Sequence, residues 1–130
     1  MCPVYINRIA SIHAESRNEK PYFSAQEPDY KEMITNANLR RRMSRMIKMG
    51  VACGLECLKD IPSEKVDAII TATGLGCLAD TEKFMNALMD NREQMLNPTA
   101  FIQSTFNTVG AQLALLLKIH AYNVTYVHRG

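Results

Sequence analysis

The chain has 130 residues, the usual length of one domain, and a net charge of +2. With 47% hydrophobic and 22% charged residues, the composition supports a packed core and excludes a disordered, collagen-like or low-complexity chain. The pI of about 8.4 is too low to indicate a nucleic-acid-binding protein, for which a domain pI above ~9 and a basic stripe are typical.

The first predicted element is a strand over residues 4–12, which are rich in β-branched side chains and follow Pro3, a residue that suits a strand start. Residues 14–28 are polar and contain two prolines, so they predict the longest irregular stretch of the chain. Asp29 then precedes a short helical turn, with Glu32 three residues later at the spacing of a capping box.

The clearest helix is predicted over residues 38–59, because apolar residues recur there at spacings of three and four. Gly50 and Gly54 lie one turn apart on its apolar face, so we expect a neighbouring backbone to pack closely there. Residues 66–73 predict a second strand that is nearly all apolar or β-branched, the pattern of a strand covered on both faces in a parallel sheet.

Three helices and a third strand complete the predicted order. The helices run from Asp80 or Thr81 to about Asn91, over residues 99–103, and over residues 108–119, the last apolar almost all round and therefore central. The strand covers residues 122–127. Strands that alternate with helices indicate an α/β domain whose sheet is at least partly parallel, and so few strands lead us to expect an incomplete sheet.

Cysteine and histidine spacing gives no sign of a metal site. The four cysteines (Cys2, Cys53, Cys57 and Cys77) form no CxxC pair, and the three histidines complete no zinc spacing. Cys53 and Cys57 are expected to be reduced thiols buried on one helix. Neither a signal-peptide pattern nor an apolar run of ~18–20 residues is visible, so we expect a cytoplasmic protein that binds no membrane and no nucleic acid.

Two local motifs are compatible with a binding role as well as with a purely structural role. The turn Gly74-Leu75-Gly76 lies between a strand and a helix, where it could cradle a phosphate; Ala79 replaces the third glycine of a dinucleotide fingerprint, and a tight turn is the simpler interpretation. The basic run over residues 40–45 fits phosphates or an acidic carrier protein, although a solvated helix face is the commoner reason for such a run. No spacing suggests a Ser-His-Asp triad.

Four stretches, taken in order, resemble the N-terminal half of the β-ketoacyl synthase family, the condensing enzymes with a thiolase fold. They are residues 41–45 with the helix that follows, residues 66–76, residues 97–111 and residues 122–125. Their detailed sequence resembles the condensing-enzyme-like proteins of aryl-polyene and flexirubin-type pathways. The resemblance implies one domain over residues 1–130, of class α/β: the N-terminal half of a thiolase-like fold, with an incomplete, mainly parallel sheet flanked by helices.

The family joins acyl units by decarboxylative Claisen condensation, and a cysteine at the N-terminus of a buried helix accepts the acyl chain. Matching Thr125 and Gly130 to the family motif places Val127 at the position of that nucleophile, and valine cannot carry an acyl thioester. His120 and His128 do not match the catalytic histidines. The resemblance therefore implies no catalytic residue, no cofactor, and no condensation by this chain alone.

The leading hypothesis is a non-catalytic or truncated synthase-like module that acts through dimerisation, with a second copy or with a condensing-enzyme subunit, and that has an acyl carrier protein as a further partner. The resemblance makes Phe101, Phe106, Asn107 and Thr125 the candidates for an acyl pocket or a dimer contact. Two alternatives remain open: a fragment of an active 3-oxoacyl-acyl-carrier-protein synthase, and an unrelated small α/β ligand-binding protein that uses the Gly74–Gly76 turn.

Overall fold

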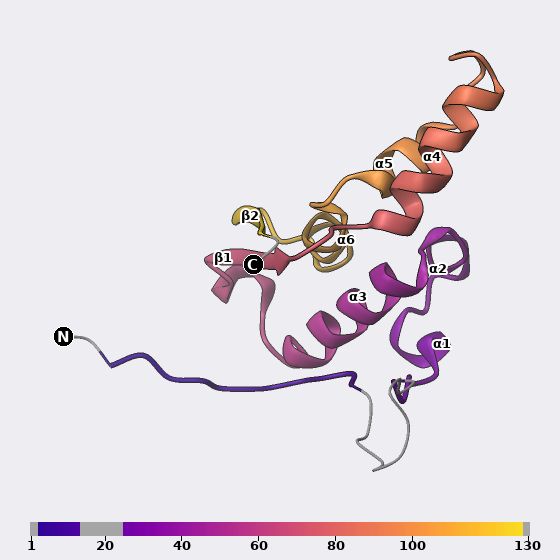
Figure 1. The fold of residues 1–130 in the computed structure, drawn as a ribbon. Helices are drawn as coiled ribbons and strands as arrows, with labels where there is room; N and C mark the ends of the chain where they lie inside the picture. The colour runs from indigo at the N-terminus through magenta and orange to yellow at the C-terminus, as the bar shows by residue number, and fades with distance from the viewer. Residues whose placement is uncertain (1–2, 14–24, 129–130) are drawn as a thin grey trace, which may run out of the picture.

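The computed structural model describes residues 3–13 and 25–128 of the chain. Six α-helices, one 3-10 helix and two strands follow one another in this part, as Figure 1 shows. In chain order they are α1 (Tyr30–Met33), α2 (Ala37–Arg42), α3 (Arg45–Cys57), η1 (Ser63–Lys65), β1 (Ala68–Thr73), α4 (Leu78–Asp90), α5 (Pro98–Ser104), α6 (Thr108–Leu117) and β2 (Tyr122–Val127).

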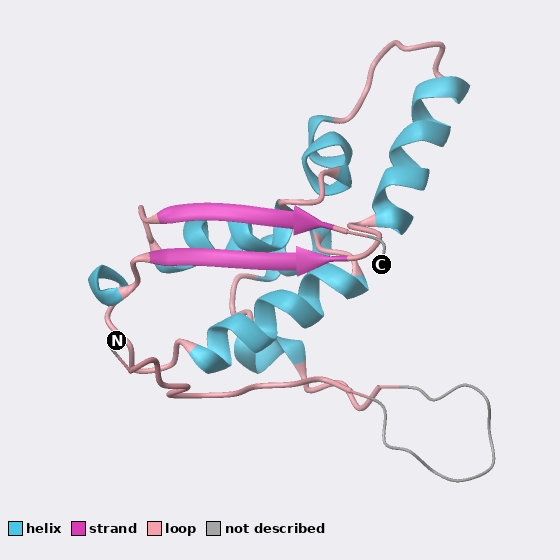
Figure 2. Cartoon of the chain, turned by 60° about the vertical axis from the view of Figure 1, so that its left-hand side comes forward, coloured by secondary structure: helices cyan, strands magenta, loops and turns pink. Residues whose placement is uncertain are grey.

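The sheet consists of β1 and β2, which run parallel and pair in register from Ala68 with Tyr122 to Thr73 with Val127. A parallel pair needs a crossover connection, and α4, α5 and α6 supply it. Helix α6 contacts both strands and also α3, so helices cover one face of the sheet (Figure 2). This arrangement confirms the predicted α/β class with a parallel sheet and flanking helices.

The core lies between α3, α6 and the covered face of the sheet. Its buried side chains are Ile34, Met43, Ile47, Val51, Ile69, Cys77, Leu113 and Ile119. Two glycines of α3 let α6 come close: a β-carbon on Gly50 would lie 2.8 Å from a methyl of Val109, and one on Gly54 would lie 2.5 Å from a methyl of Leu113. The close approach was predicted correctly, but the neighbours are side chains rather than backbone.

Helices α4 and α5 pack mainly against each other and extend away from the sheet (Figure 1). Phe84 and Phe101 hold the pair together, with ring centroids 5.5 Å apart. Met85, Met89 and Ile102 remain exposed on these helices. No single helix of the described residues is long and apolar enough to cross a membrane. Helices α5 and α6 taken together have the necessary length and composition, but the chain bends by 109° between them.

Two sequence expectations about local structure are wrong. Residues 4–12 form no strand, because no neighbouring strand pairs with them in the described part of the chain. The single helix expected over residues 38–59 is two helices, because the backbone of Met43 is extended and a new helix begins after Ser44. Serine is favoured at such a start, and the Ser44 carbonyl accepts the first helical hydrogen bond, from Lys48 at 3.0 Å.

The expectation that the strand over residues 66–73 is covered on both faces is also wrong. Its side chains alternate between covered and exposed: Ile69 is 8% exposed, whereas Ile70 is 66% exposed. The reason is that the described residues supply helices to one face only. The other predicted elements are confirmed to within a few residues, and the third strand matches β2 at both ends.

Candidate functional site

A pocket of about 350 Å³ opens beside the carboxyl end of β1, between the sheet and helices α3 and α6. Ligands of parallel α/β sheets commonly bind at the carboxyl ends of the strands, so this is the expected place for a site. Met46 of α3 and Val109 and Leu113 of α6 form apolar walls, and Phe106 lies on the segment that leads into α6. The pocket therefore suits an apolar ligand.

Three threonines line the pocket, and two of them pair with each other across the sheet. Thr71 of β1 and Thr125 of β2 are paired in the ladder, and their hydroxyl oxygens lie 2.5 Å apart. The Thr71 hydroxyl also donates to the carbonyl oxygen of Val124 at 3.4 Å. Because these hydroxyls bind each other and the backbone, they orient the floor of the pocket without presenting a charge to a ligand.

The turn after β1 forms the rim of the pocket and has a left-handed residue. Gly76 has φ of +64°, and its N–H donates to the Thr73 hydroxyl oxygen at 2.9 Å. A β-carbon there would lie 3.1 Å from the Cβ of Phe106, so glycine is needed both for the backbone angle and for the approach of Phe106. The turn thus fixes the position of Phe106 at the pocket.

Cys77 lines the pocket and stands directly before the first residue of helix α4, as its N-cap. Burial, and secondarily the carboxylate of Asp80, raise the pKa of the Cys77 thiol above its usual value. A nucleophilic cysteine is favoured by a lowered pKa, which a neighbouring cation or a helix N-terminus provides; Cys77 has the helix N-terminus, while burial acts in the opposite direction. The described residues that line the pocket include no histidine, lysine or arginine.

The structure brings two of the four predicted pocket residues together. Phe106 and Thr125 both line the pocket, whereas the Phe101 ring lies tilted against that of Phe84 in the α4–α5 pair and Asn107 lies exposed before α6. Val127 lies opposite Thr73 at the carboxyl end of β2. Whether these residues contact an acyl chain or a partner remains a prediction.

A second pocket of about 300 Å³ continues past the same turn and shares Met46, Gly76 and Cys77 with the first. Its other lining is mostly apolar and includes Met49. The hydroxyl oxygen of Ser44 is buried here with no hydrogen-bond partner among the described residues. The two pockets are therefore neighbours that share one wall, formed by Met46, Gly76 and Cys77.

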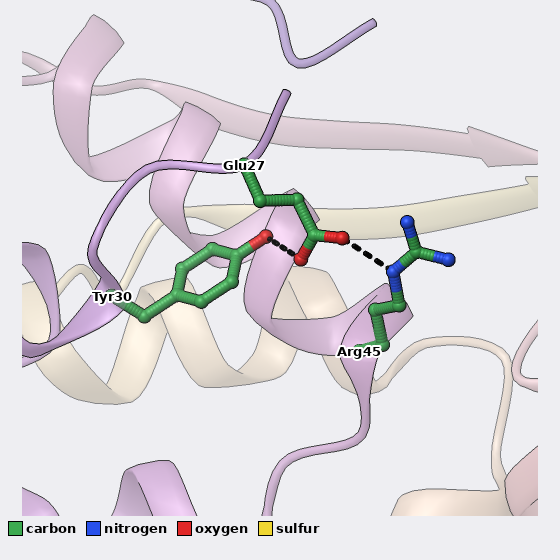
Figure 3. Close-up of polar contacts among 3 residues, drawn as sticks. All are labelled: Glu27, Tyr30 and Arg45. Atoms are coloured by element: carbon green, nitrogen blue, oxygen red, sulfur yellow. Dashed lines mark hydrogen bonds and ion pairs between the residues drawn. The ribbon is translucent and has the colours of Figure 1, made fainter. Parts of the chain in front are cut away.

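The carboxylate of Glu27 links the first residue of α1, Tyr30, to the first residue of α3, Arg45. Glu27 accepts hydrogen bonds from the Tyr30 hydroxyl at 2.7 Å and from Nε of Arg45 at 2.5 Å (Figure 3). The bond from Tyr30 and then that from Arg45 lower the pKa of Glu27, and burial together with Glu27 raises the pKa of Tyr30. This cluster fixes the entry of the chain into α1 and α3.

Sequence reasoning missed Thr71 and the contact of Asn123 with α6. Asn123 donates from its amide to the carbonyl oxygen of Gly110 at 3.0 Å, and a β-carbon on Gly110 would lie 2.7 Å from the Asn123 side-chain oxygen. Thr71 and Thr125 lie in two strands whose pairing the sequence alone does not give. The register of the sheet, which brings their hydroxyl groups together, was therefore the missing signal. Among the described residues, no group of three histidine, cysteine or carboxylate side chains is placed to hold a metal ion.

Comparison with known proteins identifies the fold. The family model described as beta-ketoacyl synthase, N-terminal domain, matches residues 13–125. A solved chain from the complex of the ketosynthase ApeO with its chain length factor ApeC, from Xenorhabdus doucetiae, is similar with a TM-score of 0.61 and 25% identity. The match covers 83% of this chain and 41% of that chain. No curated protein matches.

The structural likeness confirms the thiolase-like half-fold that the four sequence stretches predicted. The family match includes α3, β1, α6 and β2 as far as residue 125, so it includes the elements that build the site. This chain belongs to the β-ketoacyl synthase N-terminal domain family.

Proposed function

We propose that this chain is a non-catalytic or truncated synthase-like module of acyl-chain synthesis, of the aryl-polyene type, which acts through dimerisation, with a second copy or with a condensing-enzyme subunit. The observation that carries the proposal is the uncovered face of the β1–β2 sheet. Parallel sheets are almost always covered on both faces, because their strands are apolar on both sides. A face left open in the chain alone is therefore a surface that another protein layer covers.

The uncovered face is large and apolar. Ile70, Tyr122 and Tyr126 are 66%, 65% and 61% exposed, and the strand register places Ala68 beside Tyr122 and Ala72 beside Tyr126. Burying one large apolar side chain contributes about 1.5–3 kcal/mol. Tyrosine adds a hydroxyl that can find a polar partner at the edge of an interface, which is why it is enriched there.

The non-catalytic part of the proposal rests on Val127 and Cys77. Valine offers no atom that can form an acyl thioester at the position implied for the nucleophile, and burial raises the pKa of the Cys77 thiol, which opposes its activation. The module would instead contribute its pocket, with Phe106 and Thr125, to the space that holds an acyl chain.

Two partners fit the proposal. The similar solved chain comes from a ketosynthase bound to a chain length factor, which supports a heterodimer of two related subunits. An acyl carrier protein is acidic in the family that the sequence resembles, and α2 presents Arg41 and Arg42 exposed on its surface. We propose that these arginines receive the carrier, through charge attraction that raises the rate of encounter.

Analytical ultracentrifugation tests the role of the uncovered face. The chain alone, at micromolar concentration, should self-associate through that face, and I70K should shift it to monomer. I102K is the matched control, since Ile102 is exposed to a similar degree (54%) but lies on α5. A monomeric wild-type chain would contradict dimerisation with a second copy, and equal loss of association in both variants would contradict the role of the uncovered face.

Mass spectrometry tests the non-catalytic part. After incubation with acylated carrier protein, the chain should carry no acyl group on any cysteine. Stable acylation of Cys77 would show instead that the pocket holds a working nucleophile. The two experiments are independent, so association without acylation supports the whole proposal.

A further inference from the structure

Two cysteines lie one turn apart on α3. Cys53 and Cys57 are both half-buried, and neither is in a disulfide. Residues four apart on an α-helix share a face, with Cβ atoms ~5–6 Å from each other. Burial raises the pKa of the Cys53 thiol, a hydrogen bond from the backbone of Ile12 lowers it, and a charge on Cys57 raises it further. The two sulfur atoms are therefore close enough for their charges to interact.

The spacing of this pair is too wide for a disulfide. A disulfide needs Cβ atoms ~3.5–4.5 Å apart and an S–S bond of ~2 Å, so α3 would have to unwind before the pair could close. Val51 and Ala52, just before Cys53, are fully buried and hold the helix in the core. A bridging metal ion spans the wider gap, because two metal–sulfur bonds of ~2.3 Å each let the sulfurs lie as far as ~4.6 Å apart. The pair therefore suits a shared ion better than a disulfide.

An acidic pocket leads to Cys53. It has a volume of about 560 Å³ and lies between α1, α3 and residues 10–12. Its described lining contains no lysine, arginine or histidine and has four carboxylates, those of Glu27, Asp29, Glu32 and Glu56. Arg45 pairs with Glu27, whereas the other three form no ion pair within the described part of the chain. A negatively charged cavity raises the local concentration of cations, so it favours a cation beside Cys53.

We propose that Cys53 and Cys57 bind one Cu(I) ion between their two thiolates. Each thiol loses its proton as the ion binds, so two protons are released for one ion. Soft sulfur ligands select Cu(I) over cations that prefer oxygen, such as Mg²⁺ and Ca²⁺. A structural zinc ion needs four ligands, and the described residues place no three histidine, cysteine or carboxylate side chains together. A two-coordinate Cu(I) ion needs only the two sulfurs that α3 supplies.

This site is separate from the pocket between α3 and α6, which neither Cys53 nor Cys57 lines. It therefore does not depend on the association proposed above. Its contribution to the chain is a bound ion that holds two successive turns of α3 together.

Titration of the reduced full chain with Cu(I) tests the site, without oxygen and in competition with the coloured chelator bicinchoninate. The wild-type chain should bind one ion. C53S and C57S should each weaken its binding about 100-fold or more, since the lost thiol no longer acts at the high effective concentration that tethering gives. C77S should bind like wild type, because Cys77 precedes α4 and lies outside α3. Far-UV circular dichroism reports for every variant that the helices are intact.

The double variant C57S/K59C is the matched control for geometry. It keeps the number of thiols but moves the second one past the end of α3. Its affinity should fall as far as that of C57S. Equal affinity of C57S/K59C and wild type would show that any two thiols suffice and would overturn the site, as would a wild-type chain that binds no Cu(I). One ion shared by two chains, measured by sedimentation, would overturn the assignment to a single helix.

Discussion

Gly54 of α3 and Leu113 of α6 meet where no β-carbon fits between them: such an atom on Gly54 would lie 2.5 Å from Cδ1 and 3.1 Å from Cγ of Leu113. Leu113 is 6% exposed and closes the pocket from the side of α6. The distance between α3 and α6, and with it the width of the pocket, is therefore set by a glycine.

The variant G54A should lower the free energy of unfolding by about 1–2 kcal/mol. Alanine is better than glycine in a helix by ~1 kcal/mol, but overpacking a core contact costs ~1–3 kcal/mol, and the buried Leu113 has little room to yield. Urea unfolding measures the change. G74A is the control, because the nearest atom to its β-carbon is a carbonyl oxygen at 3.8 Å. A stabilised G54A would mean that α6 shifts freely.

The hydroxyl pair of Thr71 and Thr125 should show strong energetic coupling. T125V should cost about 1 kcal/mol, because it leaves the Thr71 hydroxyl without its closest partner, whereas T71V/T125V should cost less than the sum of the single variants. A double-mutant cycle from denaturant unfolding gives the coupling free energy. Additive losses would show that the two hydroxyls act independently.

The Glu27 cluster should make stability depend on pH in acid. The folded pKa of Glu27 is lowered, so its contribution is present above the ordinary carboxyl pKa and is lost as pH falls through the folded value. The difference in unfolding midpoint between wild type and E27Q should therefore be largest near neutral pH and shrink in acid. E82Q, on the exposed surface of α4, should show no such trend. If the difference in unfolding midpoint between wild type and E27Q stays constant with pH, the charge of Glu27 does not contribute to stability.

Thiol reagents should distinguish the cysteines. Cys77 is 4% exposed and its pKa is raised, so iodoacetamide at mildly alkaline pH should modify the half-buried Cys57 well before Cys77. Peptide mapping over time measures the order of alkylation. Fast modification of Cys77 would mean that the turn after β1 opens readily, and it would reopen the question of a reactive thiol in the pocket.

Elements with strong local signals could be predicted from the sequence. The alternating β-branched residues of β2 and the turn signal at Gly74–Gly76 placed the second and third strands, and the spacing of Gly50 and Gly54 predicted close packing. The break at Ser44 was not predicted, because a continuous apolar stripe hides it. Residues 14–24, where the irregular stretch was expected, lie outside the described residues.

The pocket depended on contacts that local patterns do not contain. Phe106 and Thr125 are far apart in sequence and meet only because the parallel register brings β2 beside the turn after β1. The resemblance made Phe101 and Phe106 joint candidates; in the structure α5 ends between them, and the Phe101 ring lies against that of Phe84. Likewise, helices cover only one face of β1, and this depends on the number of layers that pack around the strand. The residues of β1 alone do not specify that number.

The open face of the sheet also affects how the chain's stability is to be measured. Any molecule that covers Ile70 and Tyr126 binds the folded state alone, so it raises the melting temperature in proportion to the logarithm of its concentration. A melting temperature measured at one concentration therefore describes the chain together with whatever is bound to it, and not the chain alone. A dilution series would convert that dependence into the affinity of the face for whatever covers it.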